Sequence, residues 1–224
     1  MLIWLIFGLV TLLSFIVQLK LNSRFKKYSR IASPNGMTGA DISRLMLQRN
    51  GIRDVAVGSI PGNLTDHFDP TKKTINLSDS VYGQASIAAC AVAAHETGHA
   101  LQHATGYGPL KLRSAMVPVV NFANNTVQWV ILIGVALIQI TPALLYVGIV
   151  LFALTVLFSF VTLPVEINAS RRAVQWLESE GIVNSETKPM AVDALKWAAY
   201  TYVIAAIGSL ATLIYYIAIA NSRR

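Results

Sequence analysis

Two histidines flank a glutamate in the stretch AAHETGHALQHATGY, residues 93–107. Residues four apart lie on one face of a helix, so His95 and His99 can bind one metal ion together. Zinc lowers the pKa of a bound water to about 7. Glu96 is placed to take a proton from that water as it attacks a peptide carbonyl, and to pass the proton to the leaving amine. The spacing predicts a zinc site that hydrolyses peptide bonds; the alternative is a helix carrying ordinary polar residues.

A catalytic zinc usually has three protein ligands and one open position, so a third ligand is expected elsewhere. His103 is one candidate, but three histidines at i, i+4 and i+8 lie in a line along a helix and cannot easily surround one ion. The metzincin pattern would need a histidine at Thr105 and a glycine at Gln102, and this sequence has neither. A supporting or structural role is therefore favoured for His103.

Glu166, in LPVEINASRRA (residues 163–173), is the better candidate for the third ligand. It follows a long uncharged stretch, and an acid so close to the hydrocarbon edge needs a partner. The third apolar stretch also returns the chain to the side of the His95 helix. The alternative is an interfacial glutamate that pairs with Arg171 or Arg172.

Two further segments invite hypotheses about substrate. His67, in LTDHFDP, could donate a hydrogen bond to the developing oxyanion, or it could simply belong to a turn before Pro70. The segment KTINLS, residues 73–78, could form a sheet edge on which a peptide substrate lies as an added strand.

These residues must be positioned by a chain that is 54% hydrophobic and only 13% charged, a balance wrong for an ordinary soluble domain. A spanning helix needs roughly 20 apolar residues, and four uncharged stretches meet that length. The first lacks the basic start and cleavage site of a signal peptide, so a retained anchor is expected. Buried core helices are the alternative for each. The stretches are residues 2–19, 116–140, 142–165 and 197–220.

Four amide side chains lie in the second stretch and must face protein or water if they lie in the membrane. They are Asn121, Asn124, Asn125 and Gln128.

Basic residues flank the spans on one side, and this bias predicts that segments 20–115 and 166–196 are cytoplasmic. Arg223 and Arg224 fall on the opposite side and argue weakly against that orientation. Basic residues beside spans also explain the net charge of +7, so no nucleic-acid partner is expected. The basic residues on the cytoplasmic side are Lys20, Arg24, Lys26, Lys27, Arg30, Lys111, Arg113, Arg171, Arg172, Lys188 and Lys196.

The first of these segments carries most of the extramembrane mass. Thr38 and Asp41 predict a capped helix that ends at Gly51. Loose alternation in residues 52–60 and in KTINLS predicts short strands, turn-forming residues fill 61–73, and a long helix follows to Gly106. The single cysteine, Cys90, excludes an internal disulfide.

The expected fold is thus a mostly α, multi-pass membrane protein with about four transmembrane helices and a small α+β, zincin-like cytoplasmic segment carrying the H-E-x-x-H helix. The expected parts are an anchor, a metallopeptidase segment, a transmembrane hairpin, a cytoplasmic helix with the third ligand, and a C-terminal transmembrane helix. Their ranges are 1–19, 20–115, 116–165, 166–196 and 197–224.

The motifs LTDHFDP, AAHETGHALQHATGY and LPVEINASRRA together resemble the YugP-type family of bacterial membrane zinc metallopeptidases, over nearly the whole chain. The resemblance implies one Zn²⁺ per chain, held by His95, His99 and Glu166, with Glu96 as catalytic acid and base. The sequence is also distantly similar to the HtpX and CAAX-processing membrane proteases, whose Glu-x-x-x-Asp motif supplies the third ligand.

The sequence departs from these patterns at two positions. Ser170 stands where the Glu-x-x-x-Asp motif has its aspartate, which puts in doubt the support that this aspartate gives to a ligand histidine. Asn168 stands where the YugP-type pattern favours aspartate.

Two classes of function follow. The first is a gluzincin-like metalloendopeptidase in the bacterial plasma membrane, with a cytoplasmic active site and a peptide or membrane-protein substrate. The second is a catalytically silent, zinc-stabilised membrane scaffold or adaptor. Structural zinc sites are usually closed by four protein ligands, whereas this sequence offers three beside a glutamate, which favours the enzyme. A metal transporter is disfavoured because the spans carry no ionisable residue. The natural substrate and the oligomeric state are not determined by the sequence.

Overall fold

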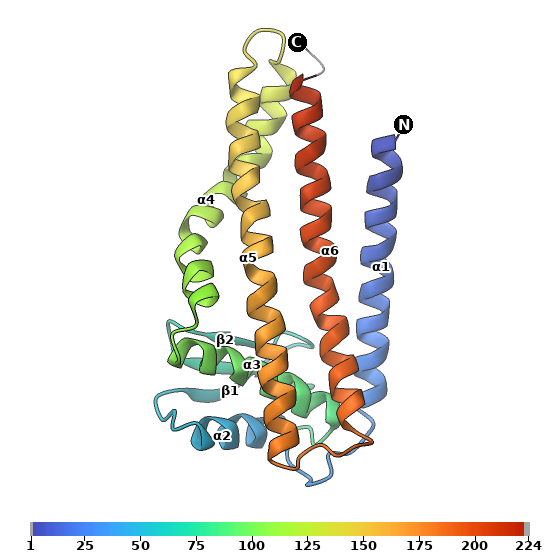
Figure 1. Ribbon diagram of the computed structural model, residues 1–224, viewed down its shortest axis with the longest axis vertical. Helices are drawn as coiled ribbons and strands as arrows, with labels where there is room; N and C mark the ends of the chain where they lie inside the picture. Colours follow the sequence, from blue (N-terminus) through green and yellow to red (C-terminus); the bar gives the residue numbers. More distant parts are fainter. Residues whose placement is uncertain (1, 222–224) are drawn as a thin grey trace. The chain divides into compact units, whose positions relative to one another are not determined.

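A computed structural model describes residues 2–221, and this range is mostly helical with one small sheet (Figure 1). Arg223 and Arg224, which bear on the expected orientation, lie outside the described residues. The helices are α1 (Leu2–Tyr28), α2 (Gly39–Arg49), α3 (Ile87–Ala104), α4 (Gly108–Ala136), α5 (Ala143–Ser179) and α6 (Lys188–Asn221).

The residues group into two compact units through which the long helices run. The first, here called the membrane unit, comprises the described residues within 1–16, 111–164 and 201–224. The second, called the catalytic unit, comprises residues 17–110 and 165–200. Helices α1, α4, α5 and α6 each contribute residues to both units.

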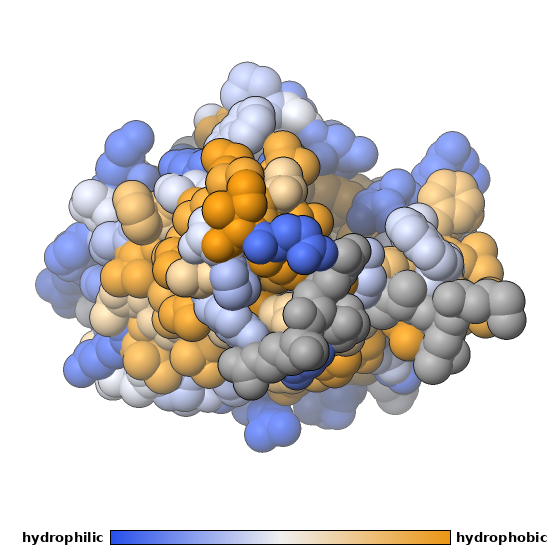
Figure 2. Space-filling view, turned by 90° about the horizontal axis from the view of Figure 1, so that it is seen from above, coloured by the Kyte–Doolittle hydropathy of each residue, from blue (hydrophilic) through white to orange (hydrophobic). Residues whose placement is uncertain are grey.

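The membrane unit is built from helices that are long and apolar enough to cross a bilayer. In the described part of the chain four helices meet that criterion, namely α1 from Trp4 onward, α4, α5 and α6. Large apolar side chains lie exposed on them, including Trp4, Trp129 and Ile214 at 71%, 63% and 57% exposure. Apolar residues are also displayed on the face seen in Figure 2. Because soluble monomers rarely expose such large apolar surfaces, these observations support the expected mostly α membrane fold.

Close helix contacts inside the membrane unit depend on glycine. A Cβ added to Gly148 of α5 would lie 2.6 Å from Cγ1 of Ile131 on α4. A Cβ on Gly134 of α4 would lie 2.7 Å from the backbone nitrogen of Leu145. Small residues of this kind let membrane helices approach closely where apolar surface alone gives no driving force for association.

The polar set of α4 lies on one exposed face of that helix. Asn121, Asn124, Asn125 and Gln128 follow one another at helical spacing, and all four are exposed. These amides were expected to face either protein or water. In the structure they do not pack against the rest of this chain.

The catalytic unit starts with the predicted capped helix. The Thr38 hydroxyl accepts a hydrogen bond from the Asp41 backbone N–H, and the Asp41 carboxylate accepts one from the Thr38 N–H, so α2 begins with a capping box. Ile42 and Met46 are fully buried on its inner face. Hydrogen bonding to Thr38 holds the pKa of Asp41 below its usual range.

The sheet has three strands in the order β1-β3-β2, with β1 (Ala56–Ile60) parallel and β2 (His67–Asp69) antiparallel to β3 (Thr74–Ser78). Two expectations are corrected here. Strand β3 is central, so KTINLS is not a sheet edge, and Thr74–Asn76 are paired on both backbone sides. Residues 67–69, expected in a turn region, form β2 because they pair with Thr74–Asn76.

Helix α3 is capped by Ser86, whose hydroxyl accepts from the Ala89 backbone N–H. Its small residues permit close packing against α5: a Cβ on Gly98 would lie 2.9 Å from the backbone oxygen of Ala169. Helix α5 continues through Pro164 and ends before Gly181, which has a left-handed φ of 66°. Residues 166–196 are therefore the end of α5, a loop and the start of α6 rather than a helix of their own.

Candidate metal centre

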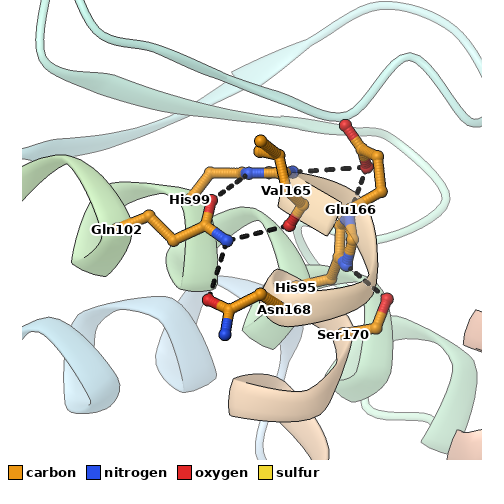
Figure 3. A network of polar contacts seen from close by, with 7 residues as sticks. All are labelled: His95, His99, Gln102, Val165, Glu166, Asn168 and Ser170. Carbon is orange, nitrogen blue, oxygen red and sulfur yellow. Dashed lines mark hydrogen bonds and ion pairs between the residues drawn. The ribbon is translucent and has the colours of Figure 1, made fainter. Parts of the chain in front are cut away.

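Three side chains from two distant segments converge in the catalytic unit. Nε2 of His95 lies 3.3 Å from Oε2 of Glu166, and Nε2 of His99 lies 3.5 Å from the same oxygen. One donor atom from each residue lies within 4.8 Å of the other two, and among the described residues this is the one group of His, Cys, Asp or Glu side chains so arranged. Figure 3 shows both imidazoles and the carboxylate pointing toward one another from α3 and α5.

The donor set and its spacing fit zinc. Histidine nitrogens and a carboxylate oxygen are ordinary zinc ligands, at about 2.0–2.2 Å from the ion. Tetrahedral geometry at that radius places neighbouring donors roughly 3.3 Å apart, close to the two measured contacts from Glu166. The Glu166 side chain is only 4% exposed, and its carboxylate places a negative charge beside the two imidazoles.

His95 is held at its other ring nitrogen by α5. Its Nδ1 lies 3.0 Å from the hydroxyl oxygen of Ser170. Ser170 is the residue that departs from the aspartate of the Glu-x-x-x-Asp motif. At this position a neutral hydroxyl contacts the candidate ligand His95.

His99 is held by an amide. Its Nδ1 lies 3.0 Å from Oε1 of Gln102, and Nε2 of Gln102 donates to the Val165 carbonyl at 2.8 Å and to Oδ1 of Asn168 at 3.0 Å. Burial lowers the pKa of His99, but the Glu166 carboxylate and the Glu96 charge outweigh burial, so the pKa lies above its ordinary value. In the absence of metal, His99 therefore holds a proton more strongly than an ordinary histidine.

Arg172, one of the two arginines considered as partners of Glu166, contacts Asn168 and Tyr107. Its Nε donates to Oδ1 of Asn168 at 2.9 Å, and its guanidinium lies over the ring of Tyr107 with 5.9 Å to the centroid. Oε2 of Glu166 lies 3.3 Å and 3.5 Å from Nε2 of His95 and of His99.

Glu96 lies on α3 between the two histidines and is only 9% exposed. Its charge is felt by His99, whose pKa it raises. Glu96 is thus buried, close enough for its charge to act on His99, and outside the group formed by His95, His99 and Glu166.

His67 lies outside this group, exposed on β2. Its Nδ1 lies 2.9 Å from the Thr65 carbonyl oxygen and its Nε2 lies 3.1 Å from Nδ2 of Asn76. Since a carbonyl only accepts, Nδ1 carries the proton and Nε2 accepts from Asn76. This tautomer offers no free N–H to an oxyanion, so the catalytic role of His67 stays a prediction.

His103 also lies outside the ligand group. It is exposed near the end of α3, and its ring packs against Phe68 with 5.8 Å between centroids. This position agrees with the argument that histidines at i, i+4 and i+8 along one helix cannot easily surround a single ion.

Gln102 is the residue whose contribution the sequence analysis missed. It is fully buried, and it connects a ligand histidine to α5. Its spacing of three from His99 was a usable signal, because residues at i and i+3 share a helix face. Its partners Val165 and Asn168 could not be found that way, since they lie more than 60 residues away.

Comparison with known proteins covers the stretch of chain that contains these residues. The model of a family described as "Putative neutral zinc metallopeptidase" matches residues 3–221. A protein of Bacillus subtilis (strain 168) named "Putative membrane protease YugP" is 45% identical over 207 residues, which is 92% of this chain and 91% of that protein. No solved structure matches the chain.

Proposed function

The chain belongs to this family of neutral zinc metallopeptidases, and from that premise we propose that it is a membrane-embedded zinc endopeptidase. His95, His99 and Glu166 hold one zinc ion, and Glu96 is the catalytic acid and base. The proposal goes beyond family membership in assigning these roles.

The observation that carries the proposal is the convergence of Glu166 with His95 and His99. Glu166 is far from the two histidines in sequence, yet one of its carboxylate oxygens lies 3.3 Å and 3.5 Å from their Nε2 atoms. When bound, zinc acts as a Lewis acid that polarises the peptide carbonyl and acidifies its water. Three protein donors leave a position open to solvent or substrate, as catalytic sites require.

The remaining chemistry is assigned to Glu96. Its carboxylate accepts a proton from the attacking water and returns that proton to the leaving amine nitrogen, so the glutamate is regenerated in each turnover. Its burial beside the histidines keeps bulk water from solvating the charge, which favours proton exchange with a bound reactant.

The proposed orientation places the catalytic unit in the cytoplasm. Four membrane crossings by α1, α4, α5 and α6 would put residues 20–115 and 166–196 on one side, where basic residues flank the spans. The related protein is named a membrane protease, and a peptide or membrane-protein segment at the cytoplasmic face is the proposed substrate.

The experiment compares the native chain with Glu96→Gln in detergent or liposomes. The zinc content of each is measured, together with cleavage of casein and of a membrane-protein peptide. We expect zinc content to be unchanged and cleavage to fall by about 100-fold or more, the usual contribution of general acid–base catalysis.

Equal cleavage by the native chain and Glu96→Gln would overturn the peptidase. Zinc binding by both without any cleavage would favour the zinc-stabilised scaffold or adaptor. The exposed Glu178 of α5, which pairs with Lys188, supplies the matched control. Glu178→Gln makes the same chemical change away from the site and should leave both measurements as in the native chain.

A further inference from the structure

The hydrogen bonds behind His99 have a fixed direction. The Val165 carbonyl can only accept, so the atom of Gln102 that contacts it must be the donating Nε2. Oε1 of Gln102 is then the atom that faces His99, and an oxygen there must accept. His99 therefore carries a proton on Nδ1, so Nε2, which faces Glu166, is the ring nitrogen available to a metal ion.

The other end of the chain of bonds is fixed independently. Arginine has donors and no acceptor, so Nε of Arg172 must donate to Oδ1 of Asn168. The same oxygen accepts from Nε2 of Gln102. Two independent contacts therefore fix the orientation of the Gln102 amide. One is the Val165 carbonyl, which must accept from Nε2. The other is Oδ1 of Asn168, which accepts from both Arg172 and Gln102.

We propose that Arg172, Asn168 and Gln102 form a directional relay that sets the tautomer of His99 and locks the His99 helix to the turn of α5 that carries Glu166. None of the three is assigned a metal-binding role; each is a positioning residue. The inference rests on the zinc binding in the proposed function, and it concerns affinity for the ion rather than peptide cleavage.

The contrast with His95 shows why the direction matters. The partner of His95 Nδ1 is the Ser170 hydroxyl, which can donate or accept and so does not by itself impose a tautomer. The Gln102 amide is fully buried, so a reversed orientation would set an N–H against His99 Nδ1–H and oxygen against the Val165 oxygen. Metal affinity is consequently sensitive to residues that never touch the ion.

Asn168 offers the sharpest test, because it contacts Gln102 and Arg172 but belongs to no ligand group. Asn168→Asp keeps an oxygen that accepts from both donors and should bind zinc as the native chain does. Asn168→Leu has similar volume and no acceptor. We expect its zinc affinity, measured by competition with a chromogenic chelator, to fall by about 10- to 100-fold, as for loss of other groups that support a ligand.

Gln102→Glu separates the relay from a purely local role. The glutamate can still accept from His99 but cannot donate to the Val165 carbonyl or to Asn168. If Gln102 served only to accept from His99, the added charge would maintain or raise zinc affinity. The relay predicts lower affinity, with a changed Co²⁺ absorption spectrum because the ligand geometry changes.

His103→Gln is the matched control on the same helix, and it should leave zinc affinity and the Co²⁺ spectrum unchanged. Arg172→Met keeps the aliphatic stem and removes the donor, so it provides a second variant if Asn168→Leu does not fold; a several-fold loss of zinc affinity is expected.

Native-like zinc affinity and Co²⁺ spectra in Asn168→Leu or Arg172→Met would overturn the relay, as would tighter binding by Gln102→Glu. The Glu96→Gln cleavage test alters none of these contacts, so the relay and the peptidase can fail separately.

Discussion

The two units differ in where polar and apolar side chains lie. In the catalytic unit, buried polar groups such as Gln102 and Glu166 are paired with partners on other elements. In the membrane unit, large apolar side chains such as Trp129 and Ile140 lie exposed, and amides on one face of α4 are exposed with them. In the membrane unit the surroundings must complete the structure, whereas in the catalytic unit the chain supplies the partners itself. Single substitutions should therefore have their largest effects in the catalytic unit.

The largest effect is expected at Glu166. Glu166→Ala removes a donor atom and leaves the two histidines without the acid that faces them, so zinc content and peptide cleavage should both be largely lost. The loss of zinc affinity should exceed the roughly 10- to 100-fold cost of removing a group that only supports a ligand. Retention of native zinc affinity, measured by chelator competition, would remove Glu166 from the site.

A pair of glycines tests the comparison directly. A Cβ on Gly98 would lie 2.9 Å from the backbone oxygen of Ala169, so Gly98→Ala must push α3 away from α5. Such overpacking typically costs about 1–3 kcal/mol of unfolding free energy, and zinc affinity should fall because ligand distances tolerate shifts of only about 0.2 Å.

Gly148→Ala makes the same change between α4 and α5 in the membrane unit. We expect thermal stability to fall while zinc affinity stays native. Equal losses of zinc affinity in the two variants would show that the units are more tightly coupled than this comparison implies.

Ser170→Ala should lower zinc affinity less than Glu166→Ala or Gly98→Ala does. It removes the hydroxyl 3.0 Å from His95 Nδ1 but leaves the ring and its packing in place. We expect zinc affinity to fall by about 10-fold, the lower end of the range for supporting groups, since water can replace a hydroxyl. Ser179→Ala, at an exposed position on the same helix, should bind zinc normally.

His67→Ala tests the remaining catalytic prediction. Zinc content should be native, because His67 lies outside the ligand group. Turnover should fall by less than the roughly 100-fold cost of losing a preformed oxyanion donor, since Nε2 accepts from Asn76 in the structure. Unchanged turnover would leave His67 as a turn and strand residue.

The smallest change concerns Cys90. Burial raises the pKa of its thiol to about 11 and no disulfide is possible for a single cysteine. Because the thiolate is the reactive form, a maleimide at pH 8 should label the folded chain very slowly. The denatured chain should be labelled fast under the same conditions. Rapid labelling of the folded chain would show that the core around α3 opens readily.

The sequence by itself determined the parts of the molecule that depend on short-range periodicity. The i, i+4 spacing of His95 and His99 requires only a helix, and the cap at Thr38 requires only its neighbours. Length and apolar content similarly sufficed for the four helices able to span a membrane. These features were predicted because each is decided within about one helical turn or one uninterrupted stretch.

Tertiary structure alone decided which distant groups meet. The sequence could nominate Glu166 but left its pairing with arginine open, and it placed KTINLS at an edge although β3 is the central strand. It also could not reveal that Gln102 connects His99 to Val165 and Asn168. Hydrogen bonds between α3 and α5 depend on how the two helices pack, and that packing depends on small residues such as Gly98 together with the whole core around them.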